Sequence, residues 1–349
     1  MPTLNPDFRQ ADEVQFNGPG GWGFSDESLS DKERREAYGR EILERDMPVA
    51  MRAGPAADPM PEMLAKWNEF QKSKGRFPGS CDWSLLDEFC FNKKLNWLPQ
   101  LIGSCVASNT FRGWVARAMY QIVLLGAAEE YLGRNEFADK NFSFYVPFSY
   151  GSARRRGNMR GGDGLYCDVM ATTLLKDGVL PCDTPKLLEI LKATSNADTN
   201  DFPEPQSTSF YRAWGDWKYL DDVKQYADYP LESCPFVTNV DELRTHLKAG
   251  SPCFFCSGIA IRKVGTHPDG FTIHARDPGN SWAHNMCFHG FFLASDGEEF
   301  FRFSNESWGV DVIYNVKTAE VADWFKNRRP SCAAIGMIRA PKSAPPTIG

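Results

Sequence analysis

The chain has 349 residues, of which 42% are hydrophobic, 13% aromatic and 24% charged; this composition is typical of a globular protein and excludes a disordered one. The formal net charge of -6 argues against nucleic acid as the main ligand. No apolar run approaches the ~20 residues that a membrane-spanning helix needs, and the N-terminus lacks the basic and apolar segments of a secretory signal peptide.

Residues 1–77 form a polar N-terminal arm. Gly/Pro-rich stretches at 18–21 and 54–59 divide it into pieces. A charged helix is predicted between them, from Ser30 to Arg45, and a second helix from Glu62 to Phe70. Because the arm has few apolar residues, we expect it to lie on the body of the protein or to bind protein neighbours.

Residues 78–238 are predicted to be the helical half. A long, mostly apolar helix is expected from Cys105 to Leu132, ended by Gly133, and such a helix is usually buried at the centre of a domain. A second helix is expected from Leu165 to Lys176. The basic run 154–156 is predicted to be a solvated loop, and residues 183–238 an irregular, aromatic-rich surface excursion.

Residues 239–340 are predicted to be the β-rich half, and 341–349 a Pro/Ser tail. A capped helix should begin at Asn239 and end at Gly250. Strands are expected over 253–261, 284–294 and 299–304, with a hairpin turn at Asp296-Gly297 between the last two. Helices followed by strands indicate an α+β fold.

The glycine run 161–164 lies between the two predicted helices of the helical half. It lacks the Lys-Ser/Thr that follows the glycines of a phosphate-binding loop. We therefore expect Gly161 and Gly162 to line a cleft, where glycine allows the backbone to approach closely.

The ten cysteines are too scattered for a disulfide scaffold, so we expect reduced, mostly buried thiols. Cys253 and Cys256 have the spacing of a redox pair, but on a strand they would face opposite sides, which favours a structural role. Among His284, Cys287 and His289, strand alternation places only the last two on one face. We therefore predict neither a metal site nor a cofactor.

Cys105 and His284 can form a catalytic pair. Cys105 begins the long predicted helix, whose free N–H groups and positive dipole end would stabilise a thiolate. His284 opens a strand, and the hairpin brings Asn305 or Glu306 near the beginning of that strand. A thiol, an imidazole and an amide or carboxylate together make a nucleophile, a base and a group that orients the base.

In this arrangement the sequence resembles the papain-like cysteine peptidases, including bacterial and phage-type members. The resemblance is carried, in the family's order, by Pro78 to Trp83, Gln100 to Cys105, Arg154 to Leu180, His284 to Phe291 and Asn305 to Gly309. Gln100 lies one residue closer to the cysteine than in the family pattern. Glu306 interrupts the Asn-Ser-Trp-Gly segment, and an ungapped match would give Glu306 the role of Asn305.

The resemblance implies a papain-like fold with a helical half, a barrel-like β-rich half and a cleft between them. Cys105 would be the nucleophile, His284 the base and Asn305 the orienter. Gln100 would complete the oxyanion hole, and Trp308 would shield the His–Asn contact. The implied activity is peptide or protein hydrolysis, in a cytoplasmic or virion-associated protein.

Two further interpretations stay open. The slipped motifs and the long arm are also compatible with a papain fold kept as a structural or binding component of a virion (capsid or tail) or another large assembly. In that case residues 1–77 would anchor the protein to its neighbours. The arm also occupies the place of a papain propeptide, so it could instead cover the cleft until it is cleaved.

Overall fold

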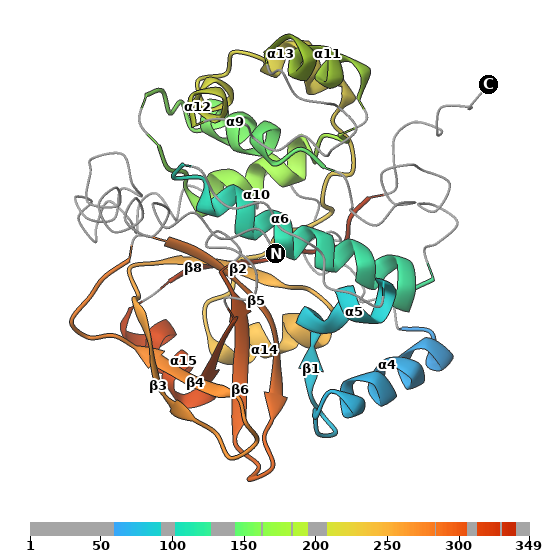
Figure 1. The fold of residues 1–349 in the computed structure, drawn as a ribbon, viewed down its shortest axis with the longest axis vertical. Coiled ribbons are helices and arrows are strands. Elements are labelled where there is room, and N and C mark those ends of the chain that lie inside the picture. Colours follow the sequence, from blue (N-terminus) through green and yellow to red (C-terminus); the bar gives the residue numbers. More distant parts are fainter. Residues whose placement is uncertain are drawn as a thin grey trace.

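The computed structural model describes residues 59–91, 102–126, 144–161, 163–182, 184–194, 208–282, 284–305, 313–328 and 330–339. The helix expected from Ser30 to Arg45 and the tail 341–349 lie outside these ranges. The described residues have an α+β fold: one part of the molecule consists of helices, and the other holds a mixed sheet with further helices packed beside it (Figure 1). None of the helices in these ranges combines the length and the apolar character needed to cross a membrane.

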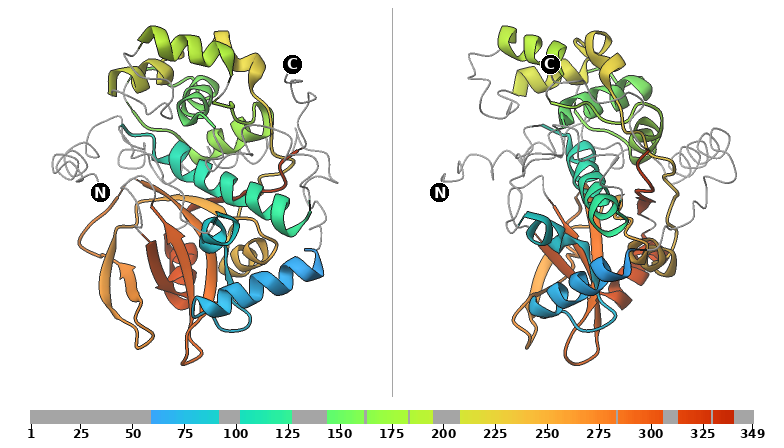
Figure 2. Two further views of the ribbon diagram at one scale, coloured as in Figure 1. Left: turned by 45° about the vertical axis from the view of Figure 1, so that its right-hand side comes forward. Right: turned by 90° about the vertical axis from the view of Figure 1, so that its right-hand side faces the viewer.

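Helix α6 (Cys105–Met119) crosses the middle of the molecule, between the sheet and the group of helices at the top of Figure 1 (Figures 1 and 2). Almost all of its side chains are buried, as its apolar composition predicts. The helix ends earlier than expected: a π-helical turn, Tyr120–Leu124, follows it, and Gly126 has φ 73°. Glycine adopts this left-handed conformation without a steric cost, so Gly126 stops the helix before Gly133.

The remaining helices include the region that we expected to be irregular. Residues 183–238 contain α11 (Pro185–Thr194), α12 (Thr208–Gly215) and α13 (Leu220–Val223), so the expectation of an irregular excursion is wrong. These helices share a small core, separate from the main one, which includes Leu187, Trp214 and Val223 together with Phe148. Helices α9 (Val146–Arg156) and α10 (Cys167–Lys176) lie on the same side of α6 as α11 to α13, whereas α5 (Leu86–Phe91) and α4 (Pro61–Ser73) lie on the sheet side of α6 (Figure 1).

The sheet has eight strands in the described residues: β1 (Cys81–Asp82), β2 (Cys253–Ser257), β3 (Ile261–Thr266), β4 (Thr272–Arg276), β5 (His284–Leu293), β6 (Glu299–Ser304), β7 (Ile313–Lys317) and β8 (Ser331–Ala334). The strand order is β3-β4-β7-β6-β5-β2-β8, and β1 pairs with β5. Only β4 and β7 pair in parallel; the other pairs are antiparallel. Because β3 and β8 lie at opposite ends of this order, the described strands form an open sheet and not the expected barrel.

The predicted hairpin between β5 and β6 is confirmed. Leu293 pairs with Glu299, and Gly297 in the turn has φ 83°. The predicted cap of α14 (Val240–Lys248) is confirmed as well, because Asn239 Oδ1 accepts hydrogen bonds from the backbone N–H groups of Asp241 and Glu242. Helix α15 (Thr318–Asn327) contacts α14 and strands β6 and β7. Because β5 and β6 pair in this hairpin, His284 at the beginning of β5 lies near Asn305, the residue that follows β6.

Candidate active site

His284 and Asn305 form a buried hydrogen bond at the beginning of β5. The His284 side chain is 1% exposed and that of Asn305 0%. His284 Nε2 lies 2.7 Å from Asn305 Oδ1. An amide oxygen only accepts hydrogen bonds, so Nε2 carries the proton, and in the neutral ring Nδ1 is the basic nitrogen.

Burial makes the His284 ring a weak base. Loss of solvent lowers the pKa of His284 to about 4, and the hydrogen bond to Asn305 opposes this change only in part. The imidazole is therefore neutral at pH 7. A neutral imidazole is the form that accepts a proton from a thiol.

Cys105 is the first residue of α6 and its side chain is buried. The first backbone N–H groups of a helix have no acceptor within the helix. They lie at its positive end, where negative charge is stabilised. The predicted position of Cys105 at a helix N-terminus is therefore confirmed.

Helix α6 and strand β5 run side by side in the same direction. Asn109 Nδ2 donates to the backbone oxygen of Asn285 over 2.7 Å. One helical turn later, a Cβ on Gly113 would lie 2.8 Å from Cys287 Sγ. Four helical residues advance about 6 Å, and two strand residues advance about 6.6 Å, so the two elements stay in step. By the same spacing, the end of α6 that begins with Cys105 lies beside the end of β5 that begins with His284.

The glycine run 161–164 packs against the residues that precede Cys105. A Cβ on Gly103 would lie 2.8 Å from Asp163 Cβ and 3.0 Å from the backbone nitrogen of Gly164, so this close approach requires glycine at position 103. Gly161 has φ 67°. A Cβ on Gly161 would have no atom within 4 Å, so the close approach occurs at Gly103 and not at Gly161, and the expectation that Gly161 and Gly162 line a cleft stays a prediction.

The Arg154 side chain holds this glycine run in place, a contact that no sequence pattern predicts. The expectation of a solvated loop at 154–156 is wrong, because these residues end helix α9 and Arg154 is 1% exposed. Its guanidinium donates to the backbone oxygens of Gly161 (2.7 Å), Gly164 (2.8 Å) and Gly215 (3.2 Å). Three carbonyl acceptors make it favourable to bury the charged group.

A disulfide joins Cys167 of α10 to Cys256 of β2, which corrects the expectation that all the thiols are reduced. The side-chain amide of Asn285 donates to both sulfurs, over 3.0 Å to Cys256 and 3.4 Å to Cys167. The other eight cysteines form no disulfide bond within the described residues. Cys253 and Cys256 are not paired with each other, and no group of three or more His, Cys, Asp or Glu side chains in the described residues could hold a metal ion.

Several expected site residues lie outside the described residues. These are Gln100, Gly162, Glu306 and Trp308. Of the expected residues that are described, His284 and Asn305 are in direct contact, Cys105 begins the helix beside them, and Gly161 belongs to the glycine run near Cys105. No sequence pattern points to Asn109, Asn285 or Arg154.

Comparison with solved structures gives proteins of the papain-like cysteine protease type. The chain is similar to xylellain, a cysteine protease from Xylella fastidiosa, with 14% identity over 80% of this chain and 90% of that one and a TM-score of 0.44. It is also similar to the proform of the ragweed pollen cysteine protease Amb a 11, with 14% identity over 74% of this chain and 66% of that one and a TM-score of 0.42. Bromelain from Ananas comosus is similar with 10% identity over 75% of this chain and 100% of that one and a TM-score of 0.40. Neither a protein-family model nor a curated protein matches the sequence.

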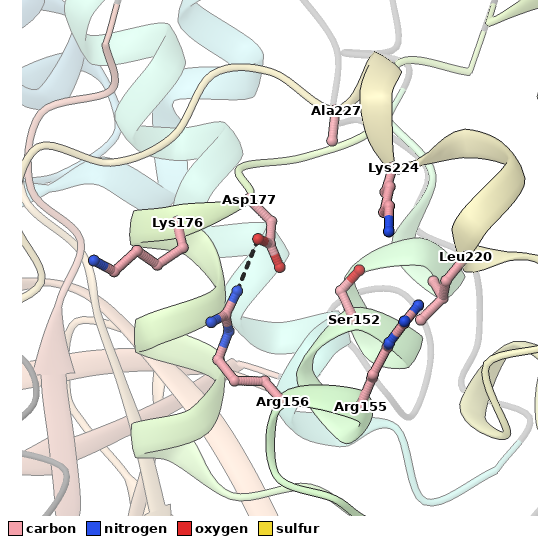
Figure 3. Close-up of a pocket in the computed structure, with 8 residues that line it drawn as sticks. All are labelled: Ser152, Arg155, Arg156, Lys176, Asp177, Leu220, Lys224 and Ala227. Atoms are coloured by element: carbon pink, nitrogen blue, oxygen red, sulfur yellow. Dashed lines mark hydrogen bonds and ion pairs between the residues drawn. The ribbon is translucent and has the colours of Figure 1, made fainter.

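A pocket of about 410 Å³ lies elsewhere, between α9, α10 and α13 (Figure 3). It is lined by Ser152, Arg155, Arg156, Lys176, Asp177, Leu220, Lys224 and Ala227. Arg156 pairs with Asp177, while Arg155 and Lys224 both pair with Asp221. These ion pairs account for most of the basic groups, and none of the candidate catalytic residues lines this pocket.

Proposed function

We propose that the protein is a papain-like cysteine hydrolase that cleaves peptides or proteins. Cys105 is the nucleophile, His284 the general base and Asn305 the residue that orients the ring. In this proposal residues 78–238 supply the thiol, residues 239–340 supply the imidazole and the amide, and the substrate binds between the two halves.

The observation that carries the proposal is the buried 2.7 Å hydrogen bond between His284 and Asn305. Strand β5 begins with an oriented, neutral imidazole and runs beside helix α6, which begins with a cysteine. Few structural roles require this combination. It supplies the three groups of a thiol hydrolase in the order nucleophile, base and orienter.

In the acylation step, His284 Nδ1 takes the proton from Cys105 Sγ, and the thiolate attacks the carbonyl carbon of the scissile bond. The tetrahedral intermediate collapses when the imidazolium gives its proton to the leaving amine, and this leaves a thioester on Cys105. Water then attacks the thioester with His284 as base, and the carboxylic acid departs.

The negative oxygen of each intermediate needs hydrogen-bond donors. In this proposal the backbone N–H of Cys105, at the N-terminus of α6, is one of them, and the Gln100 side chain is the other. The glycine run held by Arg154 supports the backbone that leads into Cys105. Trp308 would shield the His–Asn contact from water.

The test is the reactivity of the thiols toward iodoacetamide over roughly pH 4 to 9, with peptide mapping. Cys105 is expected to react selectively well below pH 8.5, the ordinary pKa of a free thiol, and His284→Ala should abolish this reactivity. Cys90 is a control within the chain, since burial raises the pKa of its thiol to about 12. Cleavage of a fluorogenic protein substrate should disappear in Cys105→Ala. If Cys105 reacts no faster than Cys90, the proposal fails.

A second candidate is a papain-type fold kept as a structural or binding component of a virion or another large assembly. The observation that favours it is the burial of Cys105, His284 and Asn305, at 0%, 1% and 0% exposed. Residues 1–77 would then make the contacts with neighbouring proteins. Under this alternative, wild type and Cys105→Ala bind the same partners, and neither cleaves substrate.

A further inference from the structure

Asn109 lies on α6 one turn after Cys105, and its side chain is fully buried. Its amide nitrogen Nδ2 donates to the backbone oxygen of Asn285 over 2.7 Å and to the backbone oxygen of Cys105 over 3.3 Å. The two acceptors belong to the first residue of the helix and to the residue that follows His284. One side chain therefore connects the two backbones that carry the thiol and the imidazole.

Only an amide of this length makes both contacts. Its nitrogen carries two hydrogens, so each carbonyl receives one. Leucine has a similar shape and no donor, serine has one donor, and an ionised aspartate has none. The neighbouring Thr110 is also buried, yet its hydroxyl has no hydrogen-bond partner within the described part of the chain. Burial of a polar group in α6 is thus not by itself a link to the sheet.

The acceptor on the strand is itself held in place. Asn285 receives the Asn109 hydrogen bond on its backbone oxygen, while its own side-chain amide donates to both sulfurs of the Cys167–Cys256 disulfide. Residue 285 is therefore tied to α6, α10 and β2. A strand fixed at this residue cannot slide along α6 without breaking these contacts.

We propose that Asn109 is a positioning residue that sets the separation of the Cys105 thiol and the His284 imidazole. This inference rests on the proposed function of the site. Proton transfer needs the two groups within about 3.2 Å of each other, and a displacement of about 1 Å can cost a factor of about 10² in rate. Asn109 does not touch the substrate. It acts by fixing the end of α6 that carries Cys105 relative to the end of β5 that carries His284.

The test uses the full chain with Asn109→Leu, which keeps the shape and removes both donors, and Thr110→Val as the matched control. The readout is the rate of Cys105 alkylation by iodoacetamide as a function of pH. Below the pKa of a free thiol, rapid alkylation requires the neighbouring imidazole, whereas above about pH 8.5 any accessible thiol ionises by itself.

Asn109→Leu is expected to lower the alkylation rate near pH 6 by at least about tenfold while changing the rate near pH 9 much less. The kcat for peptide cleavage should fall by a factor of about 10², with KM nearly unchanged. Thr110→Val should match the wild type in both assays. Asn109→Ser keeps one donor, should give intermediate rates, and serves as the test if Asn109→Leu does not fold.

Two results would overturn the inference, and they distinguish a failure of the inference alone from a failure of the proposed function. If wild-type Cys105 reacts rapidly near pH 6 and the Asn109 variants keep the wild-type pH profile while melting at lower temperature, Asn109 has a structural role only. If wild-type Cys105 shows no enhanced reactivity, the proposed function fails, and no pair exists for Asn109 to position.

Discussion

At the scale of single residues, the Asn305 side chain decides which nitrogen of His284 is basic. Its oxygen accepts from Nε2, and this leaves Nδ1 to take a proton. The amide carries no charge, so it orients the ring without stabilising the imidazolium strongly. Burial therefore dominates, and the pKa of His284 stays low, at about 4.

Replacing Asn305 by Asp is expected to separate these two effects. The carboxylate keeps an acceptor for Nε2 but adds a negative charge beside the ring, which favours the imidazolium and raises the pKa of His284. The acid limb of the kcat/KM profile should move to higher pH. Asn305→Ala, which loses the acceptor, should lower kcat/KM by a factor of about 10². An unchanged acid limb in Asn305→Asp would contradict the assignment of His284 as the base.

The residues of this site differ in how well a sequence can predict them. Cys105 and His284 belong to patterns, namely a helix start and a hairpin strand, whose geometry is known in advance, and the same hairpin leaves Asn305 and Glu306 as candidates for the third group. Asn109 and Arg154 have no such signal. Each is favourable inside the protein because folding supplies at least one backbone acceptor from far along the chain, Asn285 for Asn109 and Gly215 for Arg154. These acceptors appear only after the chain has folded.

At the scale of elements, the same distinction separates correct predictions from wrong ones. The Asp296-Gly297 hairpin and the cap at Asn239 are local, and both are confirmed. The sequence of α11 to α13 predicts irregular structure because each helix is short and its apolar residues show no long period. Their core forms only when they meet one another and helix α9, which contributes Phe148. The pairing of Cys167 with Cys256 likewise depends on contact between α10 and β2 across 89 residues of sequence.

The Cys167–Cys256 disulfide is expected to stabilise the attachment of the helices to the sheet. Crosslinks of this kind typically contribute about 2–4 kcal/mol, mainly by restricting the unfolded chain. The double variant Cys167→Ser/Cys256→Ser should therefore unfold at lower urea concentration, with Cys90→Ser, which removes a free cysteine, as the control. Mass spectrometry of a non-reduced digest should find the linked peptides. If only reduced peptides appear and dithiothreitol does not change the unfolding midpoint, the prediction is wrong.

At the scale of the whole molecule, the order of a helical part followed by a β-rich part is visible in the sequence, whereas the shape of the sheet is not. Closing a barrel requires two particular strands to pair, and alternation of apolar residues within a strand does not specify this. The open order β3 to β8 leaves β5 in the interior of the sheet, with β6 and β2 as its neighbours. Helices α6 and α14 both pack against β5, and this cover explains why both His284 and His289 on the strand are buried.

The buried histidines are expected to make the whole protein sensitive to acid. Burial lowers the pKa of His284 to about 4 and that of His289 well below 6.5. Between these values and 6.5 the unfolded chain binds protons that the folded chain does not. Stability is therefore complete above about pH 6.5 and falls as the pH decreases toward 4. At about 1.4 kcal/mol per pH unit, His284 alone accounts for about 3 kcal/mol.

Urea unfolding at a series of pH values measures this loss directly. The wild type should lose stability steadily between about pH 6.5 and 4, and His284→Gln, which cannot take up the proton, should lose about 3 kcal/mol less over the same interval. His289→Gln should reduce the loss in the same way, since its imidazole is also buried on β5. If His284→Gln and the wild type lose the same free energy, His284 is not held neutral by burial, and Nδ1 is not the weak base proposed for the site.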